Sequence, residues 1–105
     1  MKKVYFLSTC STCRKIIKEA KLENKGFVFQ NIKTDQITAA QLDEMKKRIG
    51  SYEALFSRRS MKYKSMGLKD KELAEKDYRN LILQDYTFLK RPVVISGKKI
   101  FVGRM

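Results

Sequence analysis

The sequence predicts an α/β fold built around one mixed β-sheet, and three observations predict it. Apolar runs near residues 4–7 and 93–102 have the length and composition of buried strands. Between the first run and another apolar run at residues 27–32, apolar side chains recur at helical spacing. Residues from about 37 to 90 show helical patterns and no strand pattern. The predicted order is β-α-β, a helical insertion and a β-hairpin, within a single domain of residues 1–105.

The first strand, Val4–Leu7, is followed by the turn-forming pair Ser8-Thr9. The apolar residues that come next fall at i, i+3, i+4 and i+7 and define one helix face: Cys13, Ile16, Ile17 and Ala20. We expect Gly26 to end this helix in a left-handed conformation, and Phe27 to begin the second strand. Strand, helix and strand in this order favour a parallel pair with a right-handed crossover.

The middle of the chain carries helix caps. Thr38 and Gln41 form a capping box for a helix that ends at Gly50. Ser51 can cap a short helix that runs through Leu55-Phe56. Asp70 can cap a further helix, whose apolar residues are Leu73, Ala74, Tyr78, Leu81 and Ile82.

The last segment returns to β-structure. Two apolar runs, Val93–Ile95 and Ile100–Val102, flank the segment 96–99, which has Gly97 at the turn. This pattern is typical of a β-hairpin.

Composition removes several kinds of chemistry. The chain has 105 residues, two cysteines and no histidine. Without histidine it can form no Ser-His-Asp triad, no Cys-His pair, no His-ligated zinc site and no imidazole acid–base catalyst. What remains is binding, or chemistry carried by cysteine, carboxylates, lysine or arginine.

The net charge of +13, from 24 Lys+Arg and 11 Asp+Glu, has two interpretations. One is an anionic partner: a nucleic acid, an acidic protein surface or an oxyanion substrate. The other is a solvated surface, because lysine is the commonest exterior residue. Basic residues run from Lys2 to Arg104 without concentrating in one tail, so the distribution along the chain favours the second interpretation.

We expect a cytoplasmic protein that does not interact with membranes. The apolar run Val4–Leu7 is shorter than the core of a secretory signal, which needs about 7–15 residues. No run approaches the roughly 20 apolar residues of a membrane span. Persistent structural disulfides are rare in the cytoplasm, which bears on the two cysteines.

Both cysteines lie in the segment Cys10-Ser11-Thr12-Cys13, which follows the first strand and opens the first helix. A C-x-x-C motif on a strand–helix–strand unit is typical of a thioredoxin-like redox site. Free N–H groups at the helix start stabilise a thiolate on Cys10, and Arg14 and Lys15 add positive charge nearby. We therefore expect Cys10 to be the nucleophile and Cys13, one turn later, the resolving thiol.

Two other interpretations of the cysteines stay open. Two Cys without His cannot complete a tetrahedral zinc site within one chain, so we expect no metal; a zinc ion shared between two chains is the remaining metal alternative. The other alternative is a pair of inert thiols. The placement of both cysteines at one strand-to-helix junction favours the redox site over either.

The start of the helix is also a candidate anion site. The hydroxyls of Ser11 and Thr12 lie there with the free backbone N–H groups, so an oxyanion would sit against the Cys10 sulfur. Arginine clamps such anions better than lysine does. The candidates are Arg58, Arg59, Arg91 and Arg104, each with an ordinary interpretation as a surface residue; Arg91 is better placed because it precedes the only proline, Pro92.

Five segments, in order along nearly the whole chain, resemble the arsenate reductase-like family, whose glutaredoxin-linked branch also contains the Spx-type regulators. The most specific are the cysteine loop and the Arg-Pro-Val-Val run. The segments are Cys10-Ser11-Thr12-Cys13-Arg14-Lys15, Ile32-Lys33-Thr34, Leu55-Phe56-Ser57-Arg58-Arg59-Ser60, Met66-Gly67-Leu68 and Lys90-Arg91-Pro92-Val93-Val94.

The resemblance implies a thioredoxin-like fold with a helical insertion, and it implies site roles. Cys10 matches the cysteine that attacks arsenate in the reductases of this family. The bond between Arg91 and Pro92 would be cis and would face the cysteine loop. Glutathione or glutaredoxin would supply electrons, with no bound cofactor. The arginines that would assist are Arg59 (or Arg58, one residue away in register), Arg91 and Arg104.

Cys13 departs from the reductase pattern, because glutaredoxin-linked reductases usually lack a second cysteine in this loop. The C-x-x-C form resembles Spx-type regulators, in which the pair is a redox switch and the partner is RNA polymerase. Gly50 lies about where such proteins have a glycine at the polymerase contact, and it also has the ordinary interpretation of a helix stop.

The sequence thus supports two hypotheses of different kinds. The first is a thiol-disulfide oxidoreductase, acting on a small oxyanion or a protein disulfide through Cys10, with Cys13 or glutathione resolving the intermediate. The alternative is an Spx-type redox-switch regulator that binds RNA polymerase. A family member that retains the fold but acts on another thiol substrate is a third outcome.

Overall fold

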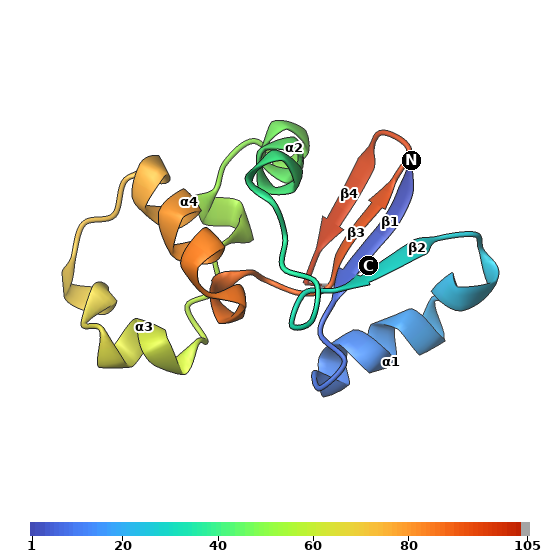
Figure 1. Ribbon diagram of the computed structural model, residues 1–105, viewed down its shortest axis with the longest axis horizontal. Coiled ribbons are helices and arrows are strands. Elements are labelled where there is room, and N and C mark those ends of the chain that lie inside the picture. Colours follow the sequence, from blue (N-terminus) through green and yellow to red (C-terminus); the bar gives the residue numbers. More distant parts are fainter. Residues whose placement is uncertain (104–105) are drawn as a thin grey trace. The chain divides into compact units, whose positions relative to one another are not determined.

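The computed structural model describes residues 1–103, so Arg104 lies outside the described residues. The chain divides into two compact units (Figure 1). One comprises Met1–Gln36 and the segment that begins at Arg91, and the other comprises Ile37–Lys90. The second unit has the limits of the predicted helical insertion. That the two units form a single domain stays a prediction.

The first unit contains a four-stranded mixed sheet. Its strands lie in the order β2-β1-β3-β4, with β1 parallel to β2 and antiparallel to β3, which pairs antiparallel with β4. This arrangement confirms the predicted α/β class, the parallel pair and the hairpin. The strands are β1 (Lys2–Phe6), β2 (Val28–Asn31), β3 (Val93–Ser96) and β4 (Lys99–Val102).

Helix α1 (Ser11–Glu19) connects the two parallel strands and packs on the sheet through its apolar face. Ile17 is in a buried cluster with Val4 of β1 and Val94 of β3. Phe6 and Phe29, whose rings meet edge to face at 5.8 Å, pack against the same cluster. The sheet therefore fixes the direction of α1, and with it the position of the loop that precedes the helix.

The expected end of this helix at Gly26 is wrong. Helix α1 ends at Glu19, Lys21 adopts a left-handed conformation with φ 54°, and a 3₁₀ turn, η1, follows at Leu22–Asn24. If the helix continued, Leu22 would lie on the same face as the exposed Lys18, because residues four positions apart lie on one side of an α-helix. The break turns Leu22 into the core, where it is 1% exposed. Gly26 does have a positive φ of 78°, but in the turn before β2.

The second unit is helical, as predicted. Its elements are α2 (Ala39–Ile49), η2 (Glu53–Leu55), α3 (Met61–Ser65), η3 (Leu68–Asp70), α4 (Glu75–Gln84) and η4 (Tyr86–Phe88). The capping box is confirmed, since the Gln41 N–H donates to the Thr38 hydroxyl and the Thr38 N–H donates to the Gln41 side chain, both at 3.0 Å. Gly50 ends α2 with φ 105°. The Ser51 hydroxyl accepts from the Ala54 N–H at 3.1 Å.

The predicted cap at Asp70 is wrong, because Asp70 lies inside η3. Helix α4 begins only at Glu75, and its start is held by Asp77, whose carboxylate accepts from the Ala74 N–H at 2.8 Å. A carboxylate at the third helical position can accept a hydrogen bond from the N–H of the capping residue. It can therefore stabilise the helix start even where the capping residue has no polar side chain. The short helix α3, which buries none of its side chains, left no apolar pattern to predict it from.

Ion pairs join the elements of the second unit. Arg79 of α4 donates twice to the Asp43 carboxylate of α2, at 2.8 and 3.2 Å, and the Tyr52 hydroxyl donates to the same carboxylate at 2.5 Å. These hydrogen bonds from Arg79 and Tyr52 lower the pKa of Asp43 to about 2. The carboxylate therefore stays charged in all but strong acid.

Replacing Thr38 by Ala is expected to destabilise the second unit by about 1 kcal/mol, because the Gln41 N–H loses its acceptor at the start of α2. Urea unfolding followed by far-ultraviolet circular dichroism measures the change. The matched control is Thr38→Ser, which keeps the hydroxyl and is expected to unfold close to the wild type. Equal stability of Thr38→Ala and the wild type would contradict the role given to the cap.

Candidate active site

The loop from β1 into α1 holds the two cysteines in different environments. The Cys10 N–H donates to the Leu7 carbonyl at 2.9 Å, and the Arg14 N–H donates to the Cys10 carbonyl at 3.2 Å. These bonds place Cys10 at the N-cap of α1, with extended backbone angles of φ −90° and ψ 114°. The predicted position of Cys10 immediately before the helix is therefore confirmed.

Cys10 is half-buried, and its thiol has a lowered pKa. Burial alone would raise the pKa, but hydrogen bonds outweigh it. They come from the backbone N–H of Cys13, the Cys13 thiol and the Arg91 guanidinium, whose positive charge also favours the thiolate. The site thus stabilises a sulfur anion on Cys10.

Cys13 is fully buried on the inner face of α1. Burial raises the pKa of Cys13 to about 11, and the negative charge on Cys10 contributes in the same direction. Both cysteines are free thiols. The two environments separate the thiols chemically: Cys10 ionises more readily than an ordinary thiol, and Cys13 holds its proton and donates a hydrogen bond.

Arg91 and Pro92 lie beside the cysteine loop, at the start of β3. The Arg91-Pro92 peptide bond is cis, as the family resemblance implied. Pro92 is buried, and its carbonyl accepts from the Gly103 N–H at 2.8 Å. Arg91 is half-buried and hydrogen-bonds the Cys10 sulfur. Of the arginines predicted for the anion, Arg91 is the one that the structure brings to Cys10 within the first unit.

Asn31 is a site residue that sequence reasoning missed. It ends β2, and its side-chain amide donates to the Ser8 hydroxyl at 3.0 Å, in the loop before Cys10. Its side-chain oxygen accepts from the Lys33 N–H at 3.2 Å. The sequence did contain a signal for this residue. The predicted parallel pairing of β1 and β2 brings the carboxyl ends of both strands to one edge of the sheet. A polar residue at the end of the second strand could have been assigned to the loop of the first.

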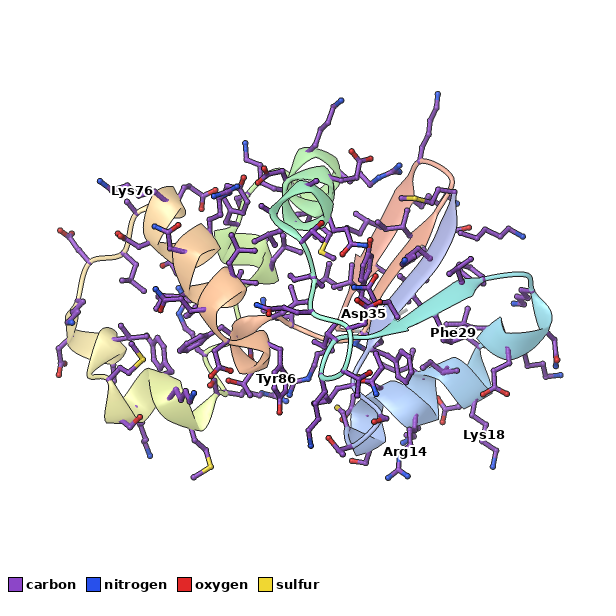
Figure 2. The ribbon with its side chains drawn as sticks, viewed as in Figure 1. Arg14, Lys18, Phe29, Asp35, Lys76 and Tyr86 are labelled. Carbon is purple, nitrogen blue, oxygen red and sulfur yellow. The ribbon has the colours of Figure 1, made fainter. Side chains whose placement is uncertain are left out.

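The other predicted residues lie in three places. Ser11 and Thr12 are the first residues of α1 and are exposed. Arg14 is exposed and projects outward from α1 (Figure 2). Arg58 and Arg59 belong to the second unit, where Arg58 donates to Glu53 at 2.9 Å and to the Tyr78 hydroxyl at 3.1 Å, and Arg59 is exposed. The anion-binding roles of these residues, and that of Arg104, stay predictions.

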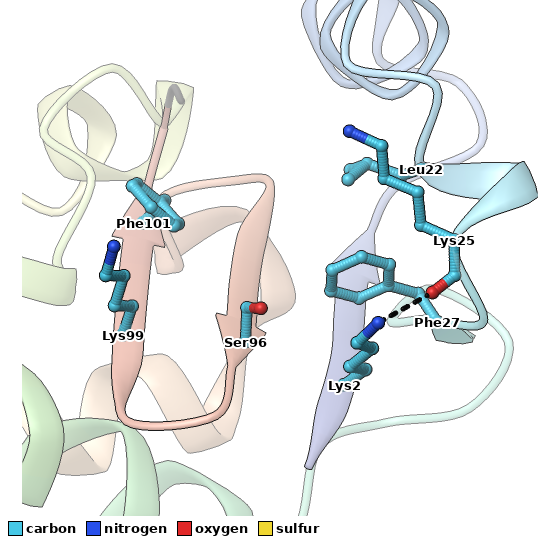
Figure 3. A pocket seen from close by; sticks show the side chains of 7 residues that line it. All are labelled: Lys2, Leu22, Lys25, Phe27, Ser96, Lys99 and Phe101. Atoms are coloured by element: carbon cyan, nitrogen blue, oxygen red, sulfur yellow. Dashed lines mark hydrogen bonds between the residues drawn. The ribbon is translucent and has the colours of Figure 1, made fainter.

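A pocket of about 400 Å³ lies elsewhere in the first unit (Figure 3). Lys2 and Ser96, which pair across β1 and β3, lie at the end of β1 away from Cys10. The pocket therefore does not contain the cysteines. Its lining residues are Lys2, Leu22, Lys25, Phe27, Ser96, Lys99 and Phe101.

Residues 1–103 contain no group of three or more His, Cys, Asp or Glu side chains arranged to hold a metal ion. The same residues include no helix with the length and apolar character needed to span a bilayer.

A cysteine pair at the start of the helix between two parallel strands, with a cis-proline beside it immediately before an antiparallel strand, defines a thioredoxin-like protein with a thiol site. Its helical unit follows the second strand. The chain belongs to the ArsC family, whose model matches residues 5–105.

Individual proteins agree with this membership. The chain is 27% identical over 105 residues to an arsenate reductase from Haemophilus influenzae, covering 96% of this chain and 89% of that protein. It is 23% identical over 104 residues to the global transcriptional regulator Spx 2 from Bacillus cereus, covering 95% and 77%. An arsenate reductase structure from Vibrio cholerae superposes with a TM-score of 0.75 at 23% identity, covering 97% and 90%, which shows a shared fold.

Replacing Arg91 by Gln is expected to raise the pKa of the Cys10 thiol, because the thiolate loses both a hydrogen bond and a neighbouring positive charge. The absorbance of thiolate at 240 nm, recorded against pH in a Cys13→Ser background, measures it. Arg14→Gln, which removes an exposed charge, serves as control and is expected to shift the pKa less. An unchanged pKa in Arg91→Gln would contradict the assignment.

Proposed function

We propose that the protein is a thiol-disulfide oxidoreductase of the arsenate reductase type, in which Cys10 is the nucleophile and Cys13 resolves the intermediate. One observation carries the proposal. Cys10 sits at the N-cap of α1 with a lowered pKa and bonded to Arg91, while Cys13, one turn later, keeps its proton. Such a difference between two adjacent thiols is what sequential attack and resolution need.

With arsenate as substrate, the Cys10 thiolate attacks arsenic. A sulfur–arsenic bond forms, and one arsenic oxygen leaves as water after taking up protons. Arg91 neutralises part of the negative charge on the oxyanion, since its guanidinium already lies against the sulfur. The N–H groups at the start of α1, beside Ser11 and Thr12, contribute further positive potential.

Resolution transfers the electrons. The Cys13 thiol loses its proton and attacks the Cys10 sulfur, so that a disulfide forms and the electron pair of the sulfur–arsenic bond passes to arsenic. Arsenic(V) becomes arsenic(III), and two thiols become one disulfide. Once Cys10 is bonded to arsenic it no longer carries the negative charge that helps hold the proton on Cys13, while Arg91 still favours the Cys13 thiolate. The first step therefore prepares the second.

A protein disulfide would be reduced through the same two steps. The Cys10 thiolate attacks one substrate sulfur and displaces the other as a thiolate, giving a mixed disulfide. Cys13 then attacks Cys10 and releases the second substrate thiol. In both cases two equivalents of glutathione, or one glutaredoxin dithiol, return the cysteines to their reduced form; glutathione can also take the place of Cys13 as the resolving thiol.

Steady-state reduction of arsenate with glutathione and glutaredoxin tests the proposal in three proteins. The wild type is expected to turn over, and Cys10→Ser to lose activity by at least about a thousandfold, since an alcohol is a far weaker nucleophile at neutral pH. Cys13→Ser separates the two resolving routes: lost activity assigns resolution to Cys13, and retained activity assigns it to glutathione. Activity that survives in Cys10→Ser would refute the role of Cys10.

A second candidate, a redox-switch regulator of the Spx type, rests on two observations. A relative is a global transcriptional regulator, and the chain has the C-x-x-C pair. In this function the Cys10–Cys13 disulfide would be the signal and RNA polymerase the partner. Gly50 is the candidate contact residue; it is exposed, and a methyl group added there would meet no atom within 4 Å.

The regulator function predicts that the protein co-purifies with RNA polymerase, and that oxidation or Cys10→Ser changes the recovered amount. Gly50→Arg should abolish recovery, because it places a bulky charge on the proposed contact. Since the φ of 105° at Gly50 strains any other residue, Gly50→Ala is the matched control: it carries the same backbone strain without the bulky charge and should still recover polymerase. Polymerase recovery that depends on oxidation, together with no turnover of arsenate or disulfides by the wild type, would favour the regulator over the enzyme. Turnover without any polymerase recovery would favour the enzyme.

A further inference from the structure

The solvent face of α1 carries a group of cations beside the cysteine pair. The buried side of the helix contains Cys13 and Ile17. The opposite side carries Arg14, Lys15 and Lys18, all exposed, and these three residues are here named the α1 cation face. Figure 2 shows Arg14 and Lys18 projecting to the same side of the helix. At 1.5 Å per residue, Arg14 lies about 6 Å and Lys18 about 12 Å along the helix axis from Cys10.

These cations have no acidic partners among residues 1–103. Four ion pairs occur there, and each one joins residues of the second unit: Arg48–Glu44, Arg58–Glu53, Lys62–Asp85 and Arg79–Asp43. The second unit therefore pairs several of its basic side chains internally. The α1 cation face leaves its charge directed to solvent.

Helix stability does not explain this arrangement. Favourable charges near a helix N-terminus are negative, yet the first turn of α1 contains no acidic residue. Arg14 and Lys15 follow in the N-terminal half of a nine-residue helix, where positive charge opposes the dipole. Only Lys18, in the last turn, is placed where a cation stabilises the helix.

We propose that the α1 cation face is a docking surface for an acidic protein that exchanges a thiol or disulfide with Cys10. The inference rests on the proposed function and names the class of its macromolecular substrate or reductant. Charge complementarity selects an acidic partner. Proximity selects a redox partner over a nucleic acid, because whatever binds this face lies alongside Cys10. Acidic residues two to five positions from a reactive cysteine, in an extended segment at about 3.3 Å per residue, would reach Arg14 and Lys18.

The test uses three synthetic peptides with a central cysteine, capped as a mixed disulfide with thionitrobenzoate. In each peptide the residues two to five positions from the cysteine, on both sides, are of one type: glutamate in the first peptide, glutamine in the second and lysine in the third. The Cys10 thiolate attacks the peptide sulfur, the original disulfide breaks, and the released thionitrobenzoate is measured by its absorbance. Cys13 then attacks Cys10 and frees the peptide thiol, so that atoms and electrons balance.

At about 10 mM ionic strength, where charges act over roughly 30 Å, the wild type is expected to react about tenfold faster with the glutamate peptide than with the glutamine peptide. At about 1 M salt the ratio should approach one, because screening shortens the range to roughly 3 Å. The lysine peptide should react more slowly than the glutamine peptide at low salt.

Two double variants with equal change of charge locate the effect. Lys15→Glu with Lys18→Glu should lose most of the glutamate-to-glutamine ratio. Lys98→Glu with Lys99→Glu should keep most of it, since these exposed residues lie by the hairpin turn, where the Gly97 N–H donates to the Met1 carbonyl at the far end of β1. Because each ratio compares two peptides on one protein, a change in the Cys10 thiolate fraction cancels.

Three results would overturn the inference. A wild-type ratio near one at low salt would remove the docking surface, and an equal loss in both double variants would reduce it to net charge. Binding of a fluorescent single-stranded oligonucleotide that Lys15→Glu with Lys18→Glu abolishes, with a peptide ratio near one, would assign the face to nucleic acid. Failure of Cys10 to react even with the glutamine peptide would instead refute the proposed function.

Discussion

The turn from β1 into α1 is the constraint on which the site depends. Because β1 pairs with both β2 and β3, and α1 packs through Ile17 on Val4 and Val94, strand and helix are fixed on either side of a very short loop. That loop leaves Cys10 at the N-cap, where it accepts hydrogen bonds, and places Cys13 on the buried face. One local geometry thus gives two cysteines opposite shifts in pKa.

Periodicity and local chemistry predicted most of the fold. The mixed sheet follows from the apolar runs, and the Thr38 capping box follows from residue types three positions apart. The errors arose where tertiary packing decides the outcome. Helix α1 could have continued to Gly26 by its local sequence, but burial of Leu22 required a break at Lys21. Asp70 and Asp77 offer equal capping chemistry, and only the packed structure selects Asp77.

The candidate site was predictable to the extent that it is local. Cys10 and Cys13 stand three positions apart in sequence, so the helix period alone sets their relation. Arg91 is eighty-one positions from Cys10, and no periodicity connects the two residues. Arg91 could be predicted as a site residue only from the proline that follows it and from the family resemblance. Asn31 was missed because its contact with Ser8 depends on strand register, which a single sequence does not specify.

The excess of positive charge takes on a more definite meaning when it is divided by structure. The even spread of basic residues along the sequence favoured a simple solvated surface. In the structure, however, the ion pairs among residues 1–103 all lie in the second unit. In the second unit, arginines and lysines neutralise neighbouring carboxylates and join helices, as Arg79 does with Asp43. Along α1 the cations stabilise little of the helix that carries them, and they stand beside the one thiol that the fold makes acidic. The lowered pKa of Cys10 comes from hydrogen bonds of Cys13 and Arg91 and from the charge of Arg91. The α1 cations have a separate role in the proposal, since positive potential beside the thiolate attracts an acidic partner.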